Sequence, residues 1–282
     1  DEVGTLTARY TYDVASGTGQ IHYSYTLLDN TSGDATQQAF AVSVKDQDGD
    51  LATNTLVVKI VDDAPLAKND TDTLAAGVSS ESGNVLTGVG TAEGAANADV
   101  QGADGAKVSA VVATTAAGAS TTVGTDTVVQ GKYGVLTISA DGSYSYERHE
   151  GAPGGVDDVF TYTLKDGDGD ESQATLTIKL GNTTPTVGEE QPNPTDPNGA
   201  PVYVIAPASV DEAGLAARGD EPAGSAAAAD SEKTAGVINF TSKDGVSEVK
   251  LGSLVLTAQD QSVTDEVGTL TARYTYDVAS GT

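Results

Sequence analysis

Residues 160–180 read FTYTLKDGDGDESQATLTIKL, and this stretch decides the fold. Apolar and polar residues alternate in both of its halves, which is the period of a strand with one buried face. Aspartates and glycines fill its centre, and these residues favour tight turns. The stretch therefore predicts a β-hairpin with one face directed into a core. The expected inward side chains are Phe160, Tyr162, Leu164, Leu176 and Ile178.

The same alternation runs through most of the chain. It recurs in FAVSVK (40–45), in NTLVVKIV (54–61) and in LTISADGSYSYE (136–147). The last of these predicts a hairpin whose Leu136 also points inward and whose Asp-Gly pair suits a tight primed turn. Only the alanine-rich stretch 213–236 has a composition that favours helix, and its Pro222 and glycines predict a long loop with a short helical turn. The fold class is therefore predicted to be all-β.

Two internal repeats define the predicted organisation. Residues 40–65 align with residues 160–185 without a gap, ten of the 26 positions being identical, and each segment is a hairpin followed by a proline. In addition, the first 18 residues, DEVGTLTARYTYDVASGT, recur unchanged at 265–282, which is a period of 264 residues. That period is too long for a solenoid unit and long enough for two ordinary domains with a linker.

These repeats predict the domain boundaries. Residues 64–182 are expected to form a complete β-sandwich, large enough for seven strands, and the proline-rich residues 183–200 a semi-extended linker. Residues 201–282 begin the next copy of a repeat, and residues 1–63 are the later part of that same repeat type. Residues 1–63 alone are thus not expected to form a complete domain. The missing part of this domain could come from residues 201–264 of the same chain or of a second copy, and both alternatives are open. In either case one copy of the duplicated stretch is expected to be displaced.

Composition excludes several functions. The net charge is −27, and such a chain would be repelled by nucleic acid and by anionic lipid. There is no cysteine, hence no disulfide and no thiolate ligand, and no apolar run reaches the roughly 20 residues that span a membrane. The two histidines, His22 and His149, have no nucleophile motif beside them, and the absence of tryptophan makes a sugar-lined cleft hard to build. We therefore do not expect an enzyme.

The acidic turns are the first candidate site. Their carboxylates fall on alternate residues, a spacing that lets a flexible loop direct them at one hard cation such as Ca²⁺. An EF-hand is excluded, because glycine stands at the fourth loop position and the twelfth position is Val57 or Thr177 instead of glutamate. A water-facing turn that uses aspartate only for its conformation is the open alternative. The candidates are Asp46, Asp48 and Asp50 in one turn and Asp166, Asp168 and Asp170 in the other.

The chain resembles bacterial surface repeats. NDTDTLAAGVSSESGNVLTG (69–88), GKYGVLTISADGSYSYE (131–147) and VDDVFTYTLKDGDGDESQATLTIKL (156–180) resemble cadherin-like VCBS repeats. VDEAGL (210–215) and DQDGDLATNTLVVKIVDDAP (46–65) are similar to the companion repeat of giant type I-secreted adhesins of the RTX type. The resemblance implies tandem immunoglobulin/cadherin-like sandwiches, calcium binding, an extracellular location on the bacterial surface and a part in biofilm adhesion.

The resemblance also implies a second candidate site, at a joint between repeats. Cadherin-like junctions gather acidic residues and neighbouring loop carboxylates around shared calcium ions. In IVDDAPLAKND (60–70) and the two residues after it, the ligands implied are Asp62, Asp63, Asn69, Asp70 and Asp72. The matching joint, LGNTTPTVG (180–188), lacks the aspartate pair, so a proline-rich spacer is expected to replace the ions there.

The function expected from the repeats is that of a spacer. A spacer needs many interchangeable copies, whereas a receptor site needs one. The expected partners are neighbouring repeats of the same protein, including head-to-tail copies, with no nucleic acid and no membrane insertion. Two alternatives stay open: a module that recognises a glycan, a matrix protein or its own kind, and an accessory domain of a secreted hydrolase.

Overall fold

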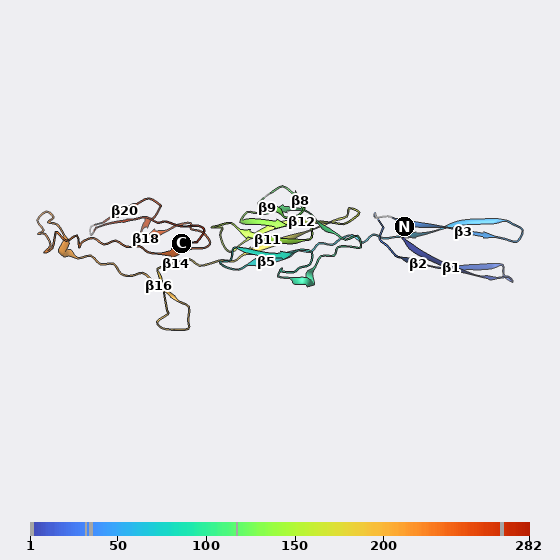
Figure 1. Ribbon diagram of the computed structural model, residues 1–282, viewed down its shortest axis with the longest axis horizontal. Helices are drawn as coiled ribbons and strands as arrows, with labels where there is room; N and C mark the ends of the chain where they lie inside the picture. Colours follow the sequence, from blue (N-terminus) through green and yellow to red (C-terminus); the bar gives the residue numbers. More distant parts are fainter. Residues whose placement is uncertain (1–2, 32, 34–35, 117, 266–267) are drawn as a thin grey trace. The chain divides into compact units, whose positions relative to one another are not determined.

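Strands dominate the structure, as the alternation predicts. Figure 1 shows a computed structural model, which describes residues 3–31, 33, 36–116, 118–265 and 268–282. Among these residues the only helical elements are two short 3-10 helices, η1 (Gly94–Asn97) and η2 (Glu212–Gly214). None of the helices in this part of the chain could cross a membrane. Asp1, Glu2, Glu266 and Val267 of the duplicated stretch lie outside the described residues.

A sandwich of two sheets occupies the middle of the chain (Figure 1). The first sheet has the strand order β6-β11-β10-β9 and the second the order β5-β13-β12-β7-β8, which makes nine strands in the described residues where seven were expected. The bounds are β5 (Asp70–Leu74), β6 (Ser80–Asn84), β7 (Lys107–Ala113), β8 (Thr121–Thr122), β9 (Thr127–Gln130), β10 (Gly134–Ile138), β11 (Ser143–Arg148), β12 (Val156–Lys165) and β13 (Glu171–Leu180).

The core of the sandwich lies where the sequence predicts it. All six side chains expected to point inward are at most 1 % exposed, which confirms the prediction. Tyr146 of one sheet and Phe160 of the other meet edge to face, with ring centroids 6.2 Å apart and an interplanar angle of 67°. Each fully buried side chain of this size contributes roughly 2 kcal/mol to the burial free energy. The six are Leu136, Phe160, Tyr162, Leu164, Leu176 and Ile178.

The hairpin at residues 136–147 forms with a different turn. Strands β10 and β11 pair antiparallel, as predicted, with Ile138 opposite Tyr144. A primed two-residue turn would need positive φ at both Asp141 and Gly142, but only Gly142 has it (φ 81°). The N–H of Gly142 instead donates to the carbonyl of Ser139 at 2.9 Å, so that the turn is one of the longer connections that end on a left-handed glycine.

Residues 3–63 form two hairpins without a core of their own. β1 pairs with β2 and β3 pairs with β4, each as a separate two-stranded sheet, and Figure 1 shows the two hairpins as separate ribbons. The predicted alternation is present, because Phe40, Leu56 and Val58 are half-buried on one face, yet no apolar side chain among the described residues of 3–63 is buried. The bounds are β1 (Gly4–Asp13), β2 (Thr18–Leu27), β3 (Gln37–Lys45) and β4 (Leu51–Lys59).

The residues after the sandwich form short strand pairs, again without a fully buried apolar side chain among those described. Four such pairs exist: β14 with β17, β15 with β16, β18 with β19, and β20 with β21. The bounds are β14 (Thr186–Val187), β15 (Glu189–Gln191), β16 (Val202–Val204), β17 (Phe240–Thr241), β18 (Lys250–Leu251), β19 (Leu254–Val255), β20 (Gln261–Thr264) and β21 (Thr269–Ala272).

The segment 183–200, which the sequence predicts to be a semi-extended linker, contains short strands. Two short strands, β14 and β15, lie within it, and Gly188 (φ 101°) separates them so that each pairs with a different partner. The prolines therefore lie mostly in the loop between β15 and β16. The alanine-rich stretch is a long loop next to the single turn η2, as predicted.

The chain divides into two compact units. One consists of Asp1–Leu74, Ser79–Arg148 and Asp157–Lys179, and the other of Ala75–Val78, His149–Val156 and Leu180–Thr282. The first unit thus contains the two N-terminal hairpins and most of the sandwich. The repeat boundaries drawn from the sequence stay predictions.

Candidate metal centre

The loop between β12 and β13 is folded so that its carboxylates converge. One oxygen of Asp166 accepts hydrogen bonds from the backbone N–H groups of Gly169 (2.9 Å) and Asp170 (2.8 Å). Gly169 has a φ of 119°, which a side chain would disfavour, and this permits the tight reversal. The loop Asp46–Asp50 is built in the same way, with Asp46 accepting from Gly49 and Asp50 at 2.9 and 2.7 Å. The sequence repeat is therefore a repeat of loop geometry.

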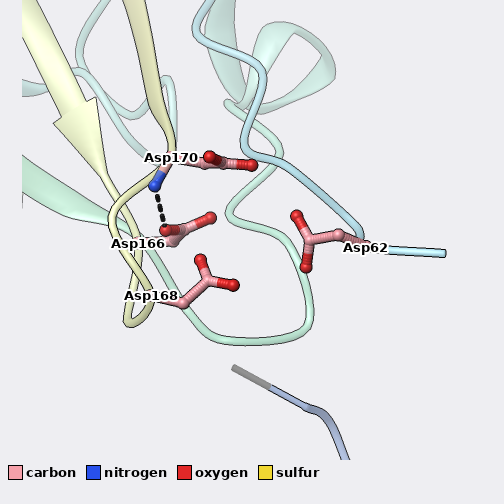
Figure 2. Close-up of side chains that lie close together, drawn as sticks. All are labelled: Asp62, Asp166, Asp168 and Asp170. Carbon is pink, nitrogen blue, oxygen red and sulfur yellow. Dashed lines mark hydrogen bonds between the residues drawn. The ribbon is translucent and has the colours of Figure 1, made fainter. Parts of the chain in front are cut away.

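Among the described residues, a fourth carboxylate joins only the β12–β13 loop. Asp62, which follows β4, lies against the β12–β13 loop, and Figure 2 shows its side chain turned toward those of Asp166, Asp168 and Asp170. One oxygen of each of the four residues lies within 4.8 Å of the others. Asp46, Asp48 and Asp50 also converge within this distance, but all three are exposed. The sequence proposed the loop and Asp62 in two separate candidate sites, and the structure brings them together.

Two oxygens of the four-carboxylate cluster are buried without a hydrogen-bond partner. These are Asp62 Oδ2 and Asp168 Oδ1. The other oxygen of Asp168 accepts from the backbone N–H of Gly33 at 2.6 Å. A buried carboxylate oxygen without a donor is costly, so such a site favours either a proton or a cation.

The charges of the cluster perturb one another. The Gly33 N–H favours the ionised form of Asp168, but the hydrogen bond with Asp166, burial, and the charges of Asp62 and Asp166 together raise the pKa of Asp168. Burial opposes ionisation of Asp166, yet the N–H groups of Gly169 and Asp170 and the bond with Asp168 lower its pKa. The charges of Asp62 and Asp166 thus oppose ionisation of Asp168.

The remaining predicted ligands lie elsewhere in the first unit. Asp63 is exposed. The side-chain oxygen of Asn69 accepts from the N–H of Thr175 at 2.9 Å, and Asp72 accepts from the hydroxyl of Tyr144 at 2.7 Å. Asp70 is 1 % exposed and accepts from the hydroxyl of Tyr162 at 3.3 Å. Metal binding by these four residues stays a prediction.

Asp70 belongs to a second group of carboxylates that sequence reasoning missed. Asp99 accepts from the same Tyr162 hydroxyl at 3.0 Å and from the N–H of Lys68 at 2.6 Å. Burial and then the charge of Asp99 raise the pKa of Asp70 to about 7. Asp99 lies 29 residues further along the chain, in the loop before β7, so spacing alone gave no sign of the contact.

Sequence reasoning also missed two further residues near the four-carboxylate cluster. Asp104 forms a hydrogen bond with the side chain of Asn30, and a Cβ placed on Gly167 of the acidic loop would lie 3.4 Å from the side chain of Asp104. Gly33 supplies the N–H already described. The available signal was the pair Asp104-Gly105, which has the composition of the acidic turns but stands alone between apolar segments.

The middle of the chain has a recognisable family. Residues 58–179 match the bacterial Ig domain family. The match begins within β4 and contains all four carboxylates of the cluster in Figure 2. Together with the two-sheet architecture, the match supports an Ig-like β-sandwich repeat in this part of the chain. No curated protein matches the chain.

Proposed function

We propose that this chain is an extender region of a large bacterial cell-surface adhesin, built from tandem Ig-like repeats and stiffened by calcium. Its role is non-catalytic: it holds distal binding domains away from the cell for biofilm formation or surface attachment. The bacterial Ig match, the internal repeats and the resemblance to type I-secreted RTX adhesins support this assignment. The same resemblance supports an extracellular location.

The observation that carries the proposal is the cluster of Asp62, Asp166, Asp168 and Asp170. It joins two parts of the chain, because Asp62 follows the β3–β4 hairpin and the other three lie in the sandwich. Two buried oxygens without donors fit a hard cation, and Ca²⁺ takes oxygen ligands in irregular arrangements. A water-facing turn, the alternative for these loops, would leave its carboxylates in solvent, as is found at Asp46, Asp48 and Asp50.

The residues would act as follows. The N–H groups of Gly169 and Asp170 hold Asp166 in place, and the N–H of Gly33 holds Asp168. Calcium supplies the positive charge that lets the four carboxylates stay together. Without it, repulsion pushes Asp62 away from the loop and frees the hairpin that precedes it. The consequence for an extender is a joint that bends when calcium is removed.

The experiment compares the chain in about 1 mM calcium and in chelator. We expect calcium to raise the Tm by several degrees, since binding at 100 times Kd stabilises a fold by about 2.7 kcal/mol. Small-angle scattering should show a longer maximum dimension in calcium. Asp62→Asn should abolish the change in maximum dimension and most of the rise in Tm, whereas Asp157→Asn, which removes the same charge from an exposed position on β12, should retain both effects. Identical scattering and Tm in both buffers would refute the proposal.

A further inference from the structure

The duplicated 18-residue stretch occupies two different settings. In the N-terminal copy, β1 pairs with β2, which follows it in the chain. In the C-terminal copy, β21 pairs with β20, which precedes it. Each residue of the first copy has an identical counterpart 264 positions later. The same strand is thus seen with two different neighbours.

The two neighbours use opposite edges of the strand. Val3 accepts from the N–H of Leu28 at 2.9 Å, so the odd-numbered residues of β1 form the hydrogen-bonded pairs with β2. The backbone groups of Gly4, Leu6 and Ala8 therefore point to the other edge of β1. Among the described residues no strand pairs with that edge.

In the C-terminal copy this other edge is occupied. Gly268 accepts from the N–H of Asp265 at 3.0 Å, so the even-numbered residues of β21 form the hydrogen-bonded pairs with β20. Leu270 lies opposite Val263, and Ala272 lies opposite Gln261. Their counterparts in the first copy are Leu6 and Ala8. One strand could therefore hold β20 on one edge and β2 on the other.

The aromatic side chains of the C-terminal copy have a packing partner that those of the N-terminal copy lack. Tyr274 and Tyr276 pack on Phe240, with ring centroids 6.4 and 5.9 Å away, and the second pair is stacked. Their counterparts Tyr10 and Tyr12 are 77 % and 59 % exposed. The N-terminal copy thus presents the aromatic side chains for which Phe240 is the partner, but without that partner.

The turn that follows the strand is the same in both copies. Asp13 accepts from the N–H groups of Ala15 and Gly17, each at 2.9 Å. Asp277 accepts from the counterparts of these two groups at 3.0 and 2.9 Å. Gly281, the counterpart of Gly17, is buried and its carbonyl accepts from the N–H of Ser242 at 2.7 Å. The turn therefore keeps the same hydrogen bonds in both settings, while β21 is a strand only over Thr269–Ala272, the counterpart of residues 5–8.

We propose that β1 of one chain takes the place of β21 in a second copy of this chain. It would pair with β20 of that copy and pack Tyr10 and Tyr12 on its Phe240, while β2 stays on the opposite edge. Since neither flanking segment buries an apolar side chain fully, each lacks what the other supplies. This association does not depend on calcium and is distinct from the extender role.

The bound β21 opposes the exchange. It is part of the same chain as β20, so its effective concentration is high, and an identical strand from another chain competes at its own lower concentration. A substitution that weakens the pairing of β21 with β20 should therefore leave the edge of β20 free for β1 of another chain. The duplication allows the same substitution to be placed in either copy as a matched control.

Proline at the hydrogen-bonding position provides this test. Ala272→Pro removes the N–H that faces β20, and Ala8→Pro removes the corresponding N–H from the open edge of β1 without affecting its bonds to β2. By sedimentation velocity, we expect Ala272→Pro to associate at concentrations about tenfold or more below those needed by the unmodified chain. Ala8→Pro should stay monomeric, and the double variant should stay monomeric as well.

A cross-link tests the register in which β1 of one chain pairs with β20 of another. It does not require that the chain still folds with proline at Ala8. Ser262 and Thr271 lie opposite each other as a non-hydrogen-bonded pair, with hydroxyl oxygens 2.9 Å apart, and such pairs are close enough for a disulfide. The natural chain has no cysteine. A chain with Ala272→Pro and Ser262→Cys should form a disulfide with a mass-tagged chain carrying Thr7→Cys, the counterpart of Thr271. A chain carrying Ser24→Cys should not form this disulfide, because Ser24 lies on β2, which is separated from β20 by β1 in the proposed complex.

Two results would overturn the proposal. One is association of Ala272→Pro that persists in the double variant, because another surface would then be responsible. The other is equal cross-linking of the Thr7→Cys and Ser24→Cys chains, or none with either. Calcium and chelator should give the same cross-linking, which separates failure of this proposal from failure of the calcium joint.

Discussion

Asp70→Asn should stabilise the sandwich at neutral pH and not at acidic pH. The carboxylate is 1 % exposed, and one of its oxygens is buried without a donor. Burial and the charge of Asp99, with a smaller contribution from Glu93, outweigh the Tyr162 hydroxyl and raise its pKa to about 7. In the unfolded chain an aspartate titrates near pH 3.9. Protonation therefore favours the folded state.

The sign and size of the effect follow from this difference. Because the folded pKa is the higher one, the stability supplied by protonation is fully present below about pH 4 and is lost as the pH rises to about 7. Between about pH 4.5 and pH 8 the loss is roughly 3 kcal/mol, which is an upper limit because water relaxes around buried charges. Asparagine keeps the shape and the acceptor for Tyr162 but never ionises, so it escapes this loss.

Thermal melts at both pH values provide the measurement. Asp72 and Asp99 also have raised pKa values and add to the pH dependence of both proteins, so the informative quantity is the difference between variant and parent. We expect the Tm of Asp70→Asn minus that of the parent to grow by more than roughly 5 °C from about pH 4.5 to pH 8. Asp157→Asn, at an exposed position, should show no such growth. If the Tm of Asp70→Asn and the Tm of the parent change with pH by the same amount, the buried carboxylate is not ionised at pH 8 and the reasoning is wrong.

Two further predictions concern other aspartates. Asp158 is 0 % exposed and accepts hydrogen bonds from the N–H groups of Lys132 (3.1 Å) and Tyr133 (2.9 Å) and from the hydroxyl of Tyr146 (3.0 Å). Asp158→Asn should therefore lower the free energy of unfolding in urea by about 2 kcal/mol, whereas Asp70→Asn should raise it at neutral pH. Calorimetric titration should separate a tighter calcium site at Asp62 and the β12–β13 loop from a site at Asp46, Asp48 and Asp50 that is at least about tenfold weaker, since the second site has three carboxylates and the first has four. A single affinity class in the parent chain that is unchanged in Asp62→Asn would contradict the second expectation.

The sequence predicted the sandwich core because alternation is a local signal. Phe160, Tyr162 and Leu164 lie on one face of a single strand, so their common burial needs no knowledge of the rest of the chain. Leu56 and Val58 show the same alternation but are only half-buried. The pattern identifies which face is apolar, whereas the extent of burial depends on which segment covers that face.

The candidate site could be predicted only in part. The loop carboxylates were found because their spacing is local, and Asp62 was found through a family resemblance. That Asp62 meets the β12–β13 loop depends on a contact across more than 100 residues, and the backbone N–H of Gly33 has no signature in sequence at all. Asp70 shows a further contact that spacing could not predict: Tyr162 and Asp99 lie beside it, and its metal binding stays a prediction.

The two joints that the sequence predicts are surrounded by different interactions. At the first, Asp62 follows β4 and meets three other carboxylates, an arrangement that a cation would complete. The aligned position after β13 is Asn182, and here the chain is held by direct contacts within the second unit: Gly155 donates to Leu180 at 2.8 Å and Thr183 to Asp244 at 2.5 Å. A Cβ on Gly154 would lie 2.5 Å from Asp244 and 2.6 Å from Asn182, so the absence of a side chain there permits the close packing. Hydrogen bonds and close packing thus lie beside the neutral Asn182, at the position where the first joint gathers carboxylates.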